Sequence, residues 1–565
     1  MTTYTLGRIS IVWKGTYSAA TTYDIQDAVN YNGSSYVCVA ASTLNVTPGT
    51  DATKWQLAAQ GIENVATTAG DIVYYHNGNL VRLPAGNAGQ VLMVKNGLPA
   101  WEDYATKSSH HVKYGGIPFA QNMSYRKGFA VMTDGSMRVW GDAGTGQLGI
   151  GNQLGDRSYP GVVAVPKSHP GWAVHDYTNN YCRFWMTYSD ETFAIDNNGQ
   201  LWSWGEQADG ALGAGGTGTN YIPFAASADT ANSINGKTVV HIAGSTGQTQ
   251  NDGHIMVLCS DGSVHSCGYN GHGQLGIGNA STQNRFLEIN STVLSGITQI
   301  EGMRLGDGAY HLVKSDGTLW HVGFNGNYQS GNSSTSDNVS PFRIPYFYDN
   351  GITVTRVWSG GYTVYALDDA NNLYSWGYNS QGQCGIGNYT DQQTPLKCLE
   401  NVAWCYPSPD DTGYAYALLT DGTVMATGNG EDGALANGTT SDQNTWTPVQ
   451  SLDNVLNGVT ITKIVAHGTD ANNSVMMLSS EGKCYSVGYN GNGQLGLGDT
   501  SERTRFEEVP IQGNVVDIAG VGYSSETGFM FHLDDGQLYQ SGYAGSSQLP
   551  EDDDEYSSVP YPIIL

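Results

Sequence analysis

Short apolar runs alternate with polar turn sequences along most of the chain, and the alternation keeps one order. An apolar run precedes a turn that usually contains Asp-Gly or Asn-Gly, and a second short run then ends at a glycine. Clear examples are FAVM before Asp134, IMVL before Asp261 and VMML before Glu481. Two β-prone runs joined by such a turn are typical of a β-hairpin. The pattern therefore predicts a series of hairpins.

The hairpin pattern recurs eight times, at intervals of 51 to 64 residues. Self-similarity at such a period indicates a repeat architecture. Each hairpin closes at one glycine, and we interpret these anchor glycines as structural positions of the repeat. They are Gly141, Gly205, Gly268, Gly323, Gly377, Gly428, Gly488 and Gly542.

A second glycine-rich stretch follows most anchor glycines, as in YNGHGQLGIGN from Tyr269, and the stretches after Gly323 and Gly542 are degraded versions of it. Glycine adopts backbone conformations that other residues avoid, which permits tight turns. We expect the apolar residue of each stretch, such as Leu148 or Leu275, to insert into a neighbouring unit.

The apolar run, the Asp-Gly turn, the Trp-Gly pair and the N-x-x-G-Q-L-G-x-G stretch together resemble the repeat of the regulator-of-chromosome-condensation (RCC1-like) β-propeller family. The resemblance covers residues 106–565 and implies an all-β fold of four-stranded blades around a central channel. Eight motifs indicate eight blades, whereas the family norm is seven, so seven or eight blades are expected. An open ring would leave unpaired edges, and we predict that the C-terminal run 559–565 completes the first or last blade.

Residues 1–60 form a predicted small β domain rich in aromatic residues, with WKGTY, DAVNYNGSSYV and KW in that order. This pattern resembles the small chitin-binding or carbohydrate-binding modules of chitinases and phage tail fibres. Where the chitinase modules present paired exposed tryptophans, residues 39–41 read Val-Ala-Ala. Core packing of the aromatic residues is therefore the competing interpretation. The resemblance implies glycan contact by Trp13, Tyr17, Tyr31 and Trp55.

Residues 61–105 contain GDIVYYHNGNLVRLPAGNAGQVLMVKNGLPAWE, which resembles the short β segments of tailed-bacteriophage fibres. Such segments commonly trimerise. A stretch of this size cannot bury a core by itself, so we expect it to pair with other chains, as a homo-oligomer with a trimer favoured. A plain interdomain linker is the alternative.

Composition and charge narrow the classes of function. The 565 residues include 75 Gly but only 18 Pro without a G-X-Y period, which excludes collagen and favours turn-rich β structure. The 24 Lys and Arg against 51 Asp and Glu give a formal charge of −27. That charge repels a phosphate backbone, so the sequence predicts no nucleic-acid binding. Charged residues make up only 13% of the chain, and its 35 Tyr suit carbohydrate contact.

The eight cysteines include no C-x-x-C pair and are interpreted as reduced core thiols. No apolar run approaches the ~20 residues of a membrane span, and the N-terminus lacks the pattern of a signal peptide. We therefore expect synthesis in a cytoplasm and no membrane insertion.

No catalytic pattern stands out, since the 13 His are scattered and G-x-S-x-G, H-E-x-x-H and Walker motifs are missing. The sequence predicts no enzyme activity, no cofactor and no metal site. The acidic run 551–555 lacks the spacing of calcium ligands and is interpreted as a solvated loop. The Trp and Tyr residues that recur near the anchor glycines are interpreted as blade packing.

The N-terminal resemblances predict a bacteriophage virion structural protein of the tail-fibre or surface-appendage class. In this hypothesis the N-terminal part attaches to other virion proteins, and the propeller contacts a host-surface glycan or protein through its loops. Alternatives are a capsid decoration protein and an RCC1-type regulatory protein acting on a small GTPase. The missing basic tail counts against chromatin binding by the latter.

Overall fold

The computed structural model describes residues 12–32, 34–59, 72–76, 79–83, 90–95, 98–103, 112–115, 127–141, 144–151, 157–174, 182–186, 190–207, 209–216, 218–244, 253–290, 292–303, 308–408, 413–467, 472–523, 526–543 and 556–563. The chain divides into two compact units, Met1–Ser109 and His110–Leu565.

The first unit begins with a four-stranded sheet in the order β1-β2-β3-β4. β1 runs parallel to β2, and the other neighbouring strands are antiparallel. Its core contains Tyr23, Val29, Cys38 and Trp55, none of them more than 2% exposed. The strands are β1 (Val12–Thr16), β2 (Asp27–Tyr31), β3 (Ser34–Cys38) and β4 (Trp55–Ala59).

Two separate two-stranded hairpins follow in the same unit. In each hairpin two residues separate the paired strand ends, and both pairs are Asn-Gly in the sequence, the strongest short-range hairpin signal. The strands are β5 (Ile72–His76), β6 (Asn79–Leu83), β7 (Gln90–Lys95) and β8 (Leu98–Asp103).

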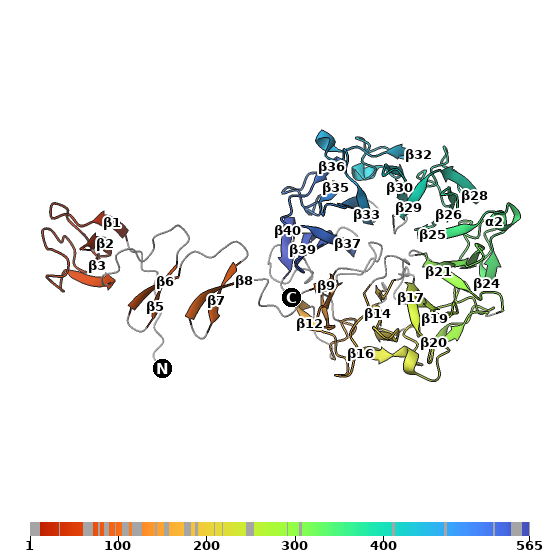
Figure 1. Ribbon diagram of the computed structural model, residues 1–565, viewed down its shortest axis with the longest axis horizontal. Helices are drawn as coiled ribbons and strands as arrows, with labels where there is room; N and C mark the ends of the chain where they lie inside the picture. The colour runs from red at the N-terminus through yellow and green to blue at the C-terminus, as the bar shows by residue number, and fades with distance from the viewer. Residues whose placement is uncertain are drawn as a thin grey trace. The chain divides into compact units, whose positions relative to one another are not determined.

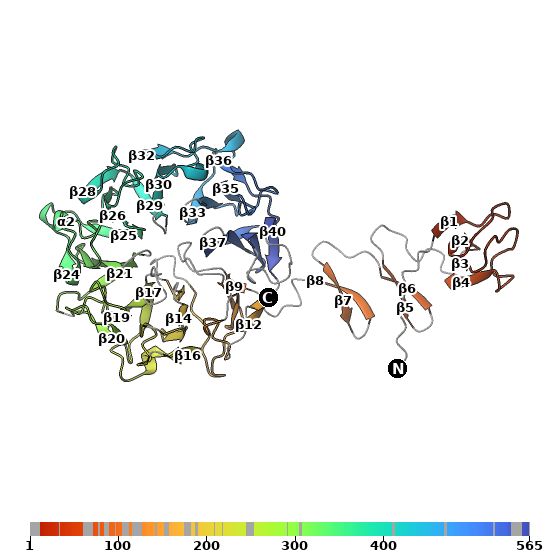
Figure 2. The ribbon, with the colours of Figure 1, turned by 180° about the vertical axis from the view of Figure 1, so that it is seen from behind.

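The second unit is a β-propeller of eight four-stranded sheets within the described residues, which settles the expected seven or eight blades at eight (Figure 1). Strands follow one another outwards from the centre in each blade, as Figure 2 also shows from behind. The first four blades consist of β9 (Val112–Gly115), β10 (Lys127–Met132), β11 (Met137–Gly141) and β12 (Arg157–Val162); β13 (Phe184–Met186), β14 (Glu191–Ile195), β15 (Leu201–Gly205) and β16 (Asn220–Ala225); β17 (Val239–Gly244), β18 (His254–Cys259), β19 (Val264–Gly268) and β20 (Gln283–Glu288); and β21 (Ile297–Gly302), β22 (Ala309–Lys314), β23 (Leu319–Gly323) and β24 (Asn338–Arg343).

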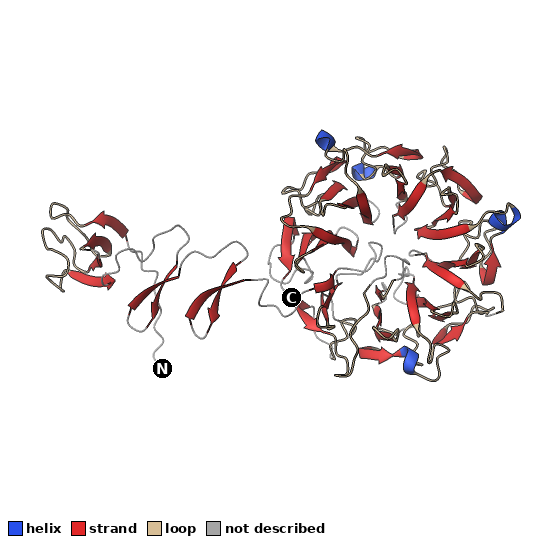
Figure 3. Cartoon of the chain, in the orientation of Figure 1, coloured by secondary structure: helices blue, strands red, loops and turns tan. Residues whose placement is uncertain are grey.

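The other four blades have the same order. They consist of β25 (Val354–Gly360), β26 (Thr363–Asp368), β27 (Leu373–Gly377) and β28 (Gln392–Leu399); β29 (Val402–Pro407), β30 (Tyr414–Leu419), β31 (Val424–Gly428) and β32 (Gln443–Pro448); β33 (Ile461–His467), β34 (Ser474–Ser479), β35 (Cys484–Gly488) and β36 (Arg503–Glu508); and β37 (Val515–Tyr523), β38 (Glu526–Leu533), β39 (Leu538–Tyr543) and β40 (Tyr556–Ile563). Short helical turns α2 (Pro345–Asp349), η1 (Ala226–Ala228), η2 (Glu431–Gly433) and η3 (Leu452–Asn454) lie in connections (Figure 3).

The Asp-Gly sequences form the turns that join the second and third strands. In the third blade the Asp261 carboxylate accepts hydrogen bonds from the backbone N–H and the hydroxyl of Ser263, at 3.0 and 2.6 Å. Gly262 adopts a φ of +77°, which glycine reaches without steric cost. The local sequence therefore specifies both the turn and the register of each hairpin.

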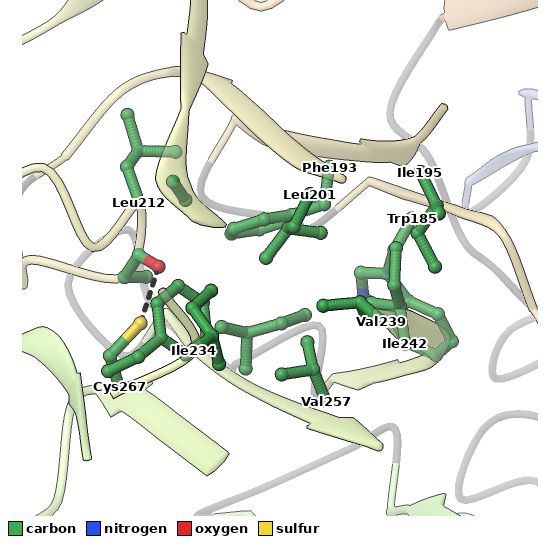
Figure 4. Close-up of a cluster of buried hydrophobic side chains, with 14 of the residues drawn as sticks. Trp185, Phe193, Ile195, Leu201, Leu212, Ile234, Val239, Ile242, Val257 and Cys267 are labelled. Carbon is green, nitrogen blue, oxygen red and sulfur yellow. Dashed lines mark hydrogen bonds between the residues drawn. The ribbon is translucent and has the colours of Figure 1, made fainter. Parts of the chain in front are cut away.

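The core of the ring is divided among the blade junctions. Each buried cluster combines apolar side chains from two adjacent blades, and Figure 4 shows the cluster between the second and third blades. There Phe193 and Leu201 of one blade meet Val239 and Val257 of the next. Since a single blade cannot bury both faces of its sheet alone, each blade is stable only with its neighbours.

The last blade packs against the first and so closes the ring. Met530, Leu538 and Ile563 of the last blade form a buried cluster with Met132 and Trp140 of the first. Ile563 belongs to β40, which pairs with β39 as the outer strand of the last blade. The prediction that the C-terminal run completes the first or last blade is confirmed, and the blade that it completes is the last.

Four outer strands contain proline: Pro223 in β16, Pro341 in β24, the buried Pro395 in β28 and the exposed Pro448 in β32. Proline lacks the N–H that a further strand would need, and it is tolerated only where that group is not required by the sheet. These prolines oppose the addition of another strand to the rim of the ring.

Candidate functional site

The aromatic residues of the N-terminal sheet separate onto its two faces. Trp55 is 2% exposed, and its indole Nε1 donates to the backbone oxygen of Val46 at 2.6 Å. Its ring contacts Tyr17 and Tyr23 edge to face, with centroids 6.0 and 5.2 Å away. The implied glycan contact by Trp55 is therefore corrected: this buried side chain is the centre of a small core, shared with Tyr23, Val29 and Cys38.

Tyr17 and Tyr31 pack on the edge of that core. Their rings meet edge to face at 5.5 Å, and both residues are half-buried. Tyr17 also stacks on Tyr23 at 5.8 Å. The rings of Tyr17 and Tyr31 are only partly accessible, and both residues contribute mainly to packing.

Trp13 differs from the other three, because its side chain is 58% exposed. It pairs with Ala28 in the next strand, and Ala28 pairs in turn with Val37. These residues occupy the sheet face opposite Val29 and Tyr36, since side chains alternate along a strand. The structure therefore leaves Trp13 as the accessible member of the predicted set, away from the aromatic core.

The anchor glycines all lie at the end of the third strand, or one residue before it in the last blade, and have φ between +97° and +106°. A side chain at seven of them would overlap a backbone oxygen at the start of the second strand; at Gly428 that oxygen belongs to Gly413. The same oxygen accepts the N–H of Asn429 at 3.0 Å. Glycine is thus required twice, for its φ and for the close approach of two backbones.

An asparagine two residues after the anchor clamps the glycine-rich loop in four blades. Asn270 accepts the N–H of Leu275 at 2.9 Å through Oδ1, and its Nδ2 donates to the oxygens of Asn279 and Ser281 at 2.9 and 3.0 Å. Asn325, Asn379 and Asn490 make the same three bonds, and all four are fully buried. Their role is not predicted from the sequence alone, although their recurrence two residues after the anchor glycine is a signal that could have indicated it.

Replacing Asn490 with alanine is expected to destabilise the propeller by about 2–4 kcal/mol, because the loop would lose the three hydrogen bonds that this buried side chain makes to the backbone of Leu495, Asp499 and Ser501. Urea unfolding of the full chain measures the loss. Thr500→Ala, at an exposed position of the same loop, is the control. Equal unfolding midpoints for the two variants would contradict the clamp.

The glycine-rich loop also joins each blade to the outer strand of the next. The N–H of Gly278 donates to the oxygen of Val339 at 2.9 Å. Equivalent bonds cross the other junctions between consecutive blades, from Gly151, Gly215, Ser333, Gly387, Gly438 and Gly498 to Tyr221, Asn284, Gln393, Asn444, Thr504 and Ser558. The repeated glycines thus serve assembly of the ring.

The aromatic residues near the anchor glycines contribute to the same junctions. The indole Nε1 of Trp204 donates to the backbone oxygen of Gln147 in the preceding blade at 2.8 Å, and Trp376 donates to that of Gln329 at 2.8 Å. Trp140, Trp204 and Trp376 are at most 1% exposed. Their interpretation as blade packing is confirmed.

Buried histidines replace apolar side chains at several positions. His241 accepts the N–H of Cys182 at 2.6 Å through Nδ1, and its Nε2 donates to the oxygen of Ile300 at 3.0 Å, so one ring spans three blades. Burial lowers the pKa of His241 to about 4 and that of His254 to about 3. Burial also lowers the pKa of His265 and His311 to about 4. These rings are neutral structural groups near pH 7.

The described residues contain no group of three or more His, Cys, Asp and Glu side chains placed to hold a metal ion. Burial raises the pKa of the Cys267, Cys384 and Cys405 thiols well above the usual value, which opposes thiolate chemistry. Within the described part of the chain, no helix is long and apolar enough to cross a membrane. The acidic run 551–555 lies outside the described residues.

Residues 371–403 match the family model described as Regulator of chromosome condensation (RCC1) repeat. The propeller consists of RCC1-like repeats. The matched segment contains β27 and β28 of the fifth blade and reaches the start of β29 in the sixth. One RCC1 repeat therefore spans the junction of two blades.

Curated proteins similar to the chain carry different names. The chain is 27% identical over 335 residues to the E3 ubiquitin-protein ligase HERC2 of Homo sapiens, covering 58% of this chain but only 6% of HERC2. It is 26% identical over 372 residues to the Ultraviolet-B receptor UVR8 of Arabidopsis thaliana, covering 64% of this chain and 75% of UVR8. Among solved structures, human WBSCR16 is 19% identical with a TM-score of 0.49, covering 68% of this chain and 96% of that protein.

Proposed function

We propose that this chain is a non-catalytic binding protein, in which the RCC1-like propeller holds variable loops against a macromolecular partner. The observation that carries this proposal is the use of the repeated polar side chains. These side chains and backbone groups already form hydrogen bonds within and between blades, as seen for Asn270 and its counterparts, the loop glycines, Trp204 and Trp376. What differs between blades is the set of exposed connections, and recognition commonly resides in such loops on a rigid scaffold.

The similar proteins support a binding role over a shared reaction. HERC2 is named as a ubiquitin ligase and UVR8 as a light receptor, and the similarity to HERC2 covers only 6% of that protein. A fold that recurs among proteins with such different names supplies a surface rather than one chemistry. The regulatory form of the proposal is an RCC1-type interaction protein acting on a small GTPase.

A second candidate, a virion appendage that contacts a host-surface glycan or protein, is favoured by the N-terminal unit. Two isolated two-stranded hairpins follow the small sheet. A lone hairpin is at best marginally stable in water, so pairing with other copies is expected, as in a trimeric fibre. In this form Trp13 is the accessible aromatic side chain for a sugar ring.

One set of measurements separates the two forms. The purified full chain is tested for its oligomeric state by light scattering, for adsorption to bacterial cells, and for release of a fluorescent guanine nucleotide from small GTPases. A monomer that accelerates nucleotide release supports the regulatory form. An oligomer that adsorbs to cells and competes with phage supports the appendage. If the full chain neither adsorbs to cells nor accelerates nucleotide release, the proposed function is overturned.

A further inference from the structure

The junction between the sixth and seventh blades departs from the repeat in two positions at once. The sixth blade reads EDGALANG from Glu431, so that Ala434 stands where the first, third, fourth, fifth and seventh blades have glutamine and the second has Ala211. On the facing blade, Asn473 stands where the third, fourth and sixth blades have Gly253, Gly308 and Gly413. The equivalence is structural, because the oxygen of each of these residues accepts the N–H of the residue that follows an anchor glycine.

A side chain at the position of Asn473 reaches the glycine-rich loop of the preceding blade. At the first junction of the ring, the Asp190 carboxylate accepts the hydroxyl of Thr145 at 2.9 Å, and Thr145 is the counterpart of Asp432. At the seventh junction, Thr527 accepts the Gln494 amide at 2.8 Å. By analogy with these two junctions, we infer that the amide of Asn473 lies beside the loop that contains Asp432.

The contacts at this junction are incomplete. Asp432 Oδ2 accepts the backbone N–H of Asn473 at 3.0 Å. The side chain of Asn473 is 0% exposed, yet neither its Oδ1 nor its Nδ2 has a hydrogen-bond partner. Leaving a buried amide unsatisfied is costly, and such a group calls for a bound water or ion.

Acidic side chains gather at the junction. Burial, together with the nearby carboxylates of Glu502 and Glu431, raises the pKa of Asp432 to about 6. Asp432 also adopts a φ of +59°, a conformation that is uncommon for a residue other than glycine. A bound cation would offset the repulsion among these carboxylates.

We propose that the Asp432–Asn473 junction binds a divalent hard cation of the Ca²⁺ class. The Asp432 carboxylate and the Asn473 amide oxygen supply ligands, water completes the coordination, and Glu431 and Glu502 add long-range attraction. Ca²⁺ accepts this mixture of carboxylate, amide and water oxygens in flexible geometry. The site lies between two blades, so a bound cation links them and stabilises the ring.

The test is a Ca²⁺ titration of the full chain, followed by calorimetry and by thermal unfolding. With few protein ligands, we expect a dissociation constant of about 10⁻⁴ to 10⁻³ M and a rise in melting temperature that saturates with Ca²⁺. Asp432→Asn keeps the shape of the side chain, and Asn473→Gly restores the residue found in three other blades. Each is expected to weaken Ca²⁺ binding by about tenfold or more, with circular dichroism confirming the fold.

Asp209→Asn is the matched control. Asp209 occupies the same place in the ADGALGAG sequence of the second blade, but it faces Gly253 and so lacks the amide. This variant is expected to bind Ca²⁺ like the natural chain. The proposal is overturned if the natural chain does not bind Ca²⁺ at millimolar concentration, if Asp432→Asn and Asn473→Gly bind it unchanged, or if Asp209→Asn abolishes binding.

Discussion

Replacing Gly428 with alanine is expected to destabilise the propeller by about 3–5 kcal/mol, a large part of the stability of a typical domain. The new Cβ would overlap the backbone oxygen of Gly413, and φ of +101° adds strain for any side chain. Neither backbone can yield easily, since the Gly413 oxygen also accepts the N–H of Asn429. Chemical denaturation of the full chain gives the free energy of unfolding.

The same blade supplies a control for the conformational part of this effect. Gly422 has φ of +90°, but an added Cβ there meets no atom within 4 Å. Gly422→Ala is therefore expected to cost only about 1 kcal/mol, which is the strain of the left-handed conformation alone. Similar costs for both variants would mean that the overlap at Gly428 is relieved by a shift of the backbone.

The propeller is expected to lose most of its stability between pH 6.5 and pH 4. The folded-state pKa of His241, His254, His265 and His311 lies at about 3 to 4, below the ordinary value of 6.5. Above pH 6.5 these rings are neutral in both states and cost nothing. As the pH falls through this window the unfolded chain takes up protons that the folded chain refuses, so the free energy of unfolding decreases.

The magnitude follows from the size of the shifts. A fall in pKa from 6.5 to about 4 corresponds to roughly 3 kcal/mol per histidine, so four such groups together rival the whole stability of a domain. Asp432 acts in the opposite direction, because its raised pKa favours the folded state as the pH falls below about 6. One carboxyl cannot offset four imidazoles. Melting temperatures recorded from pH 7.5 to pH 4 measure the net effect.

His241→Gln isolates one contribution to this acid sensitivity. Gln299 occupies the equivalent place in β21, where its amide bonds both the N–H and the oxygen of Val357 at 3.1 and 2.7 Å. A glutamine at position 241 can accept and donate in a similar way without titrating. The variant is expected to lose about 3 kcal/mol less than the natural chain between pH 6.5 and pH 4. An unchanged pH dependence would show that His241 does not contribute.

Much of the fold was predictable because its signals are local. Asp-Gly turns and anchor glycines specify each hairpin through the φ values and carboxylate bonds of a few adjacent residues, as at Asp261 and Gly262. The apolar residue of the glycine-rich stretch behaves as expected at Leu148, which joins the core shared by the first two blades. The roles of Asn270 and its counterparts were not predicted, since their partners lie five to eleven residues away along a folded loop.

The exposure of the candidate glycan-contact residues could not be predicted from local sequence signals. Trp13 and Trp55 both belong to the aromatic pattern of the N-terminal module, but Trp13 is 58% exposed and Trp55 is 2% exposed. The register of each strand decides which face of the sheet each tryptophan lies on, because side chains alternate between the two faces along a strand. The composition and the spacing of the aromatic residues do not predict which face each of them takes.

The amino-acid sequence by itself determined the repeat, the hairpins, the all-β class and the strongly acidic charge. Only the tertiary structure decided that eight blades close the ring, that β40 completes the last blade, and that His241 is buried between three blades. It also placed the unsatisfied amide of Asn473 beside Asp432. The physical reason is that turns and strands arise from neighbours in the chain, whereas junctions between blades pair residues that are tens of residues or more apart.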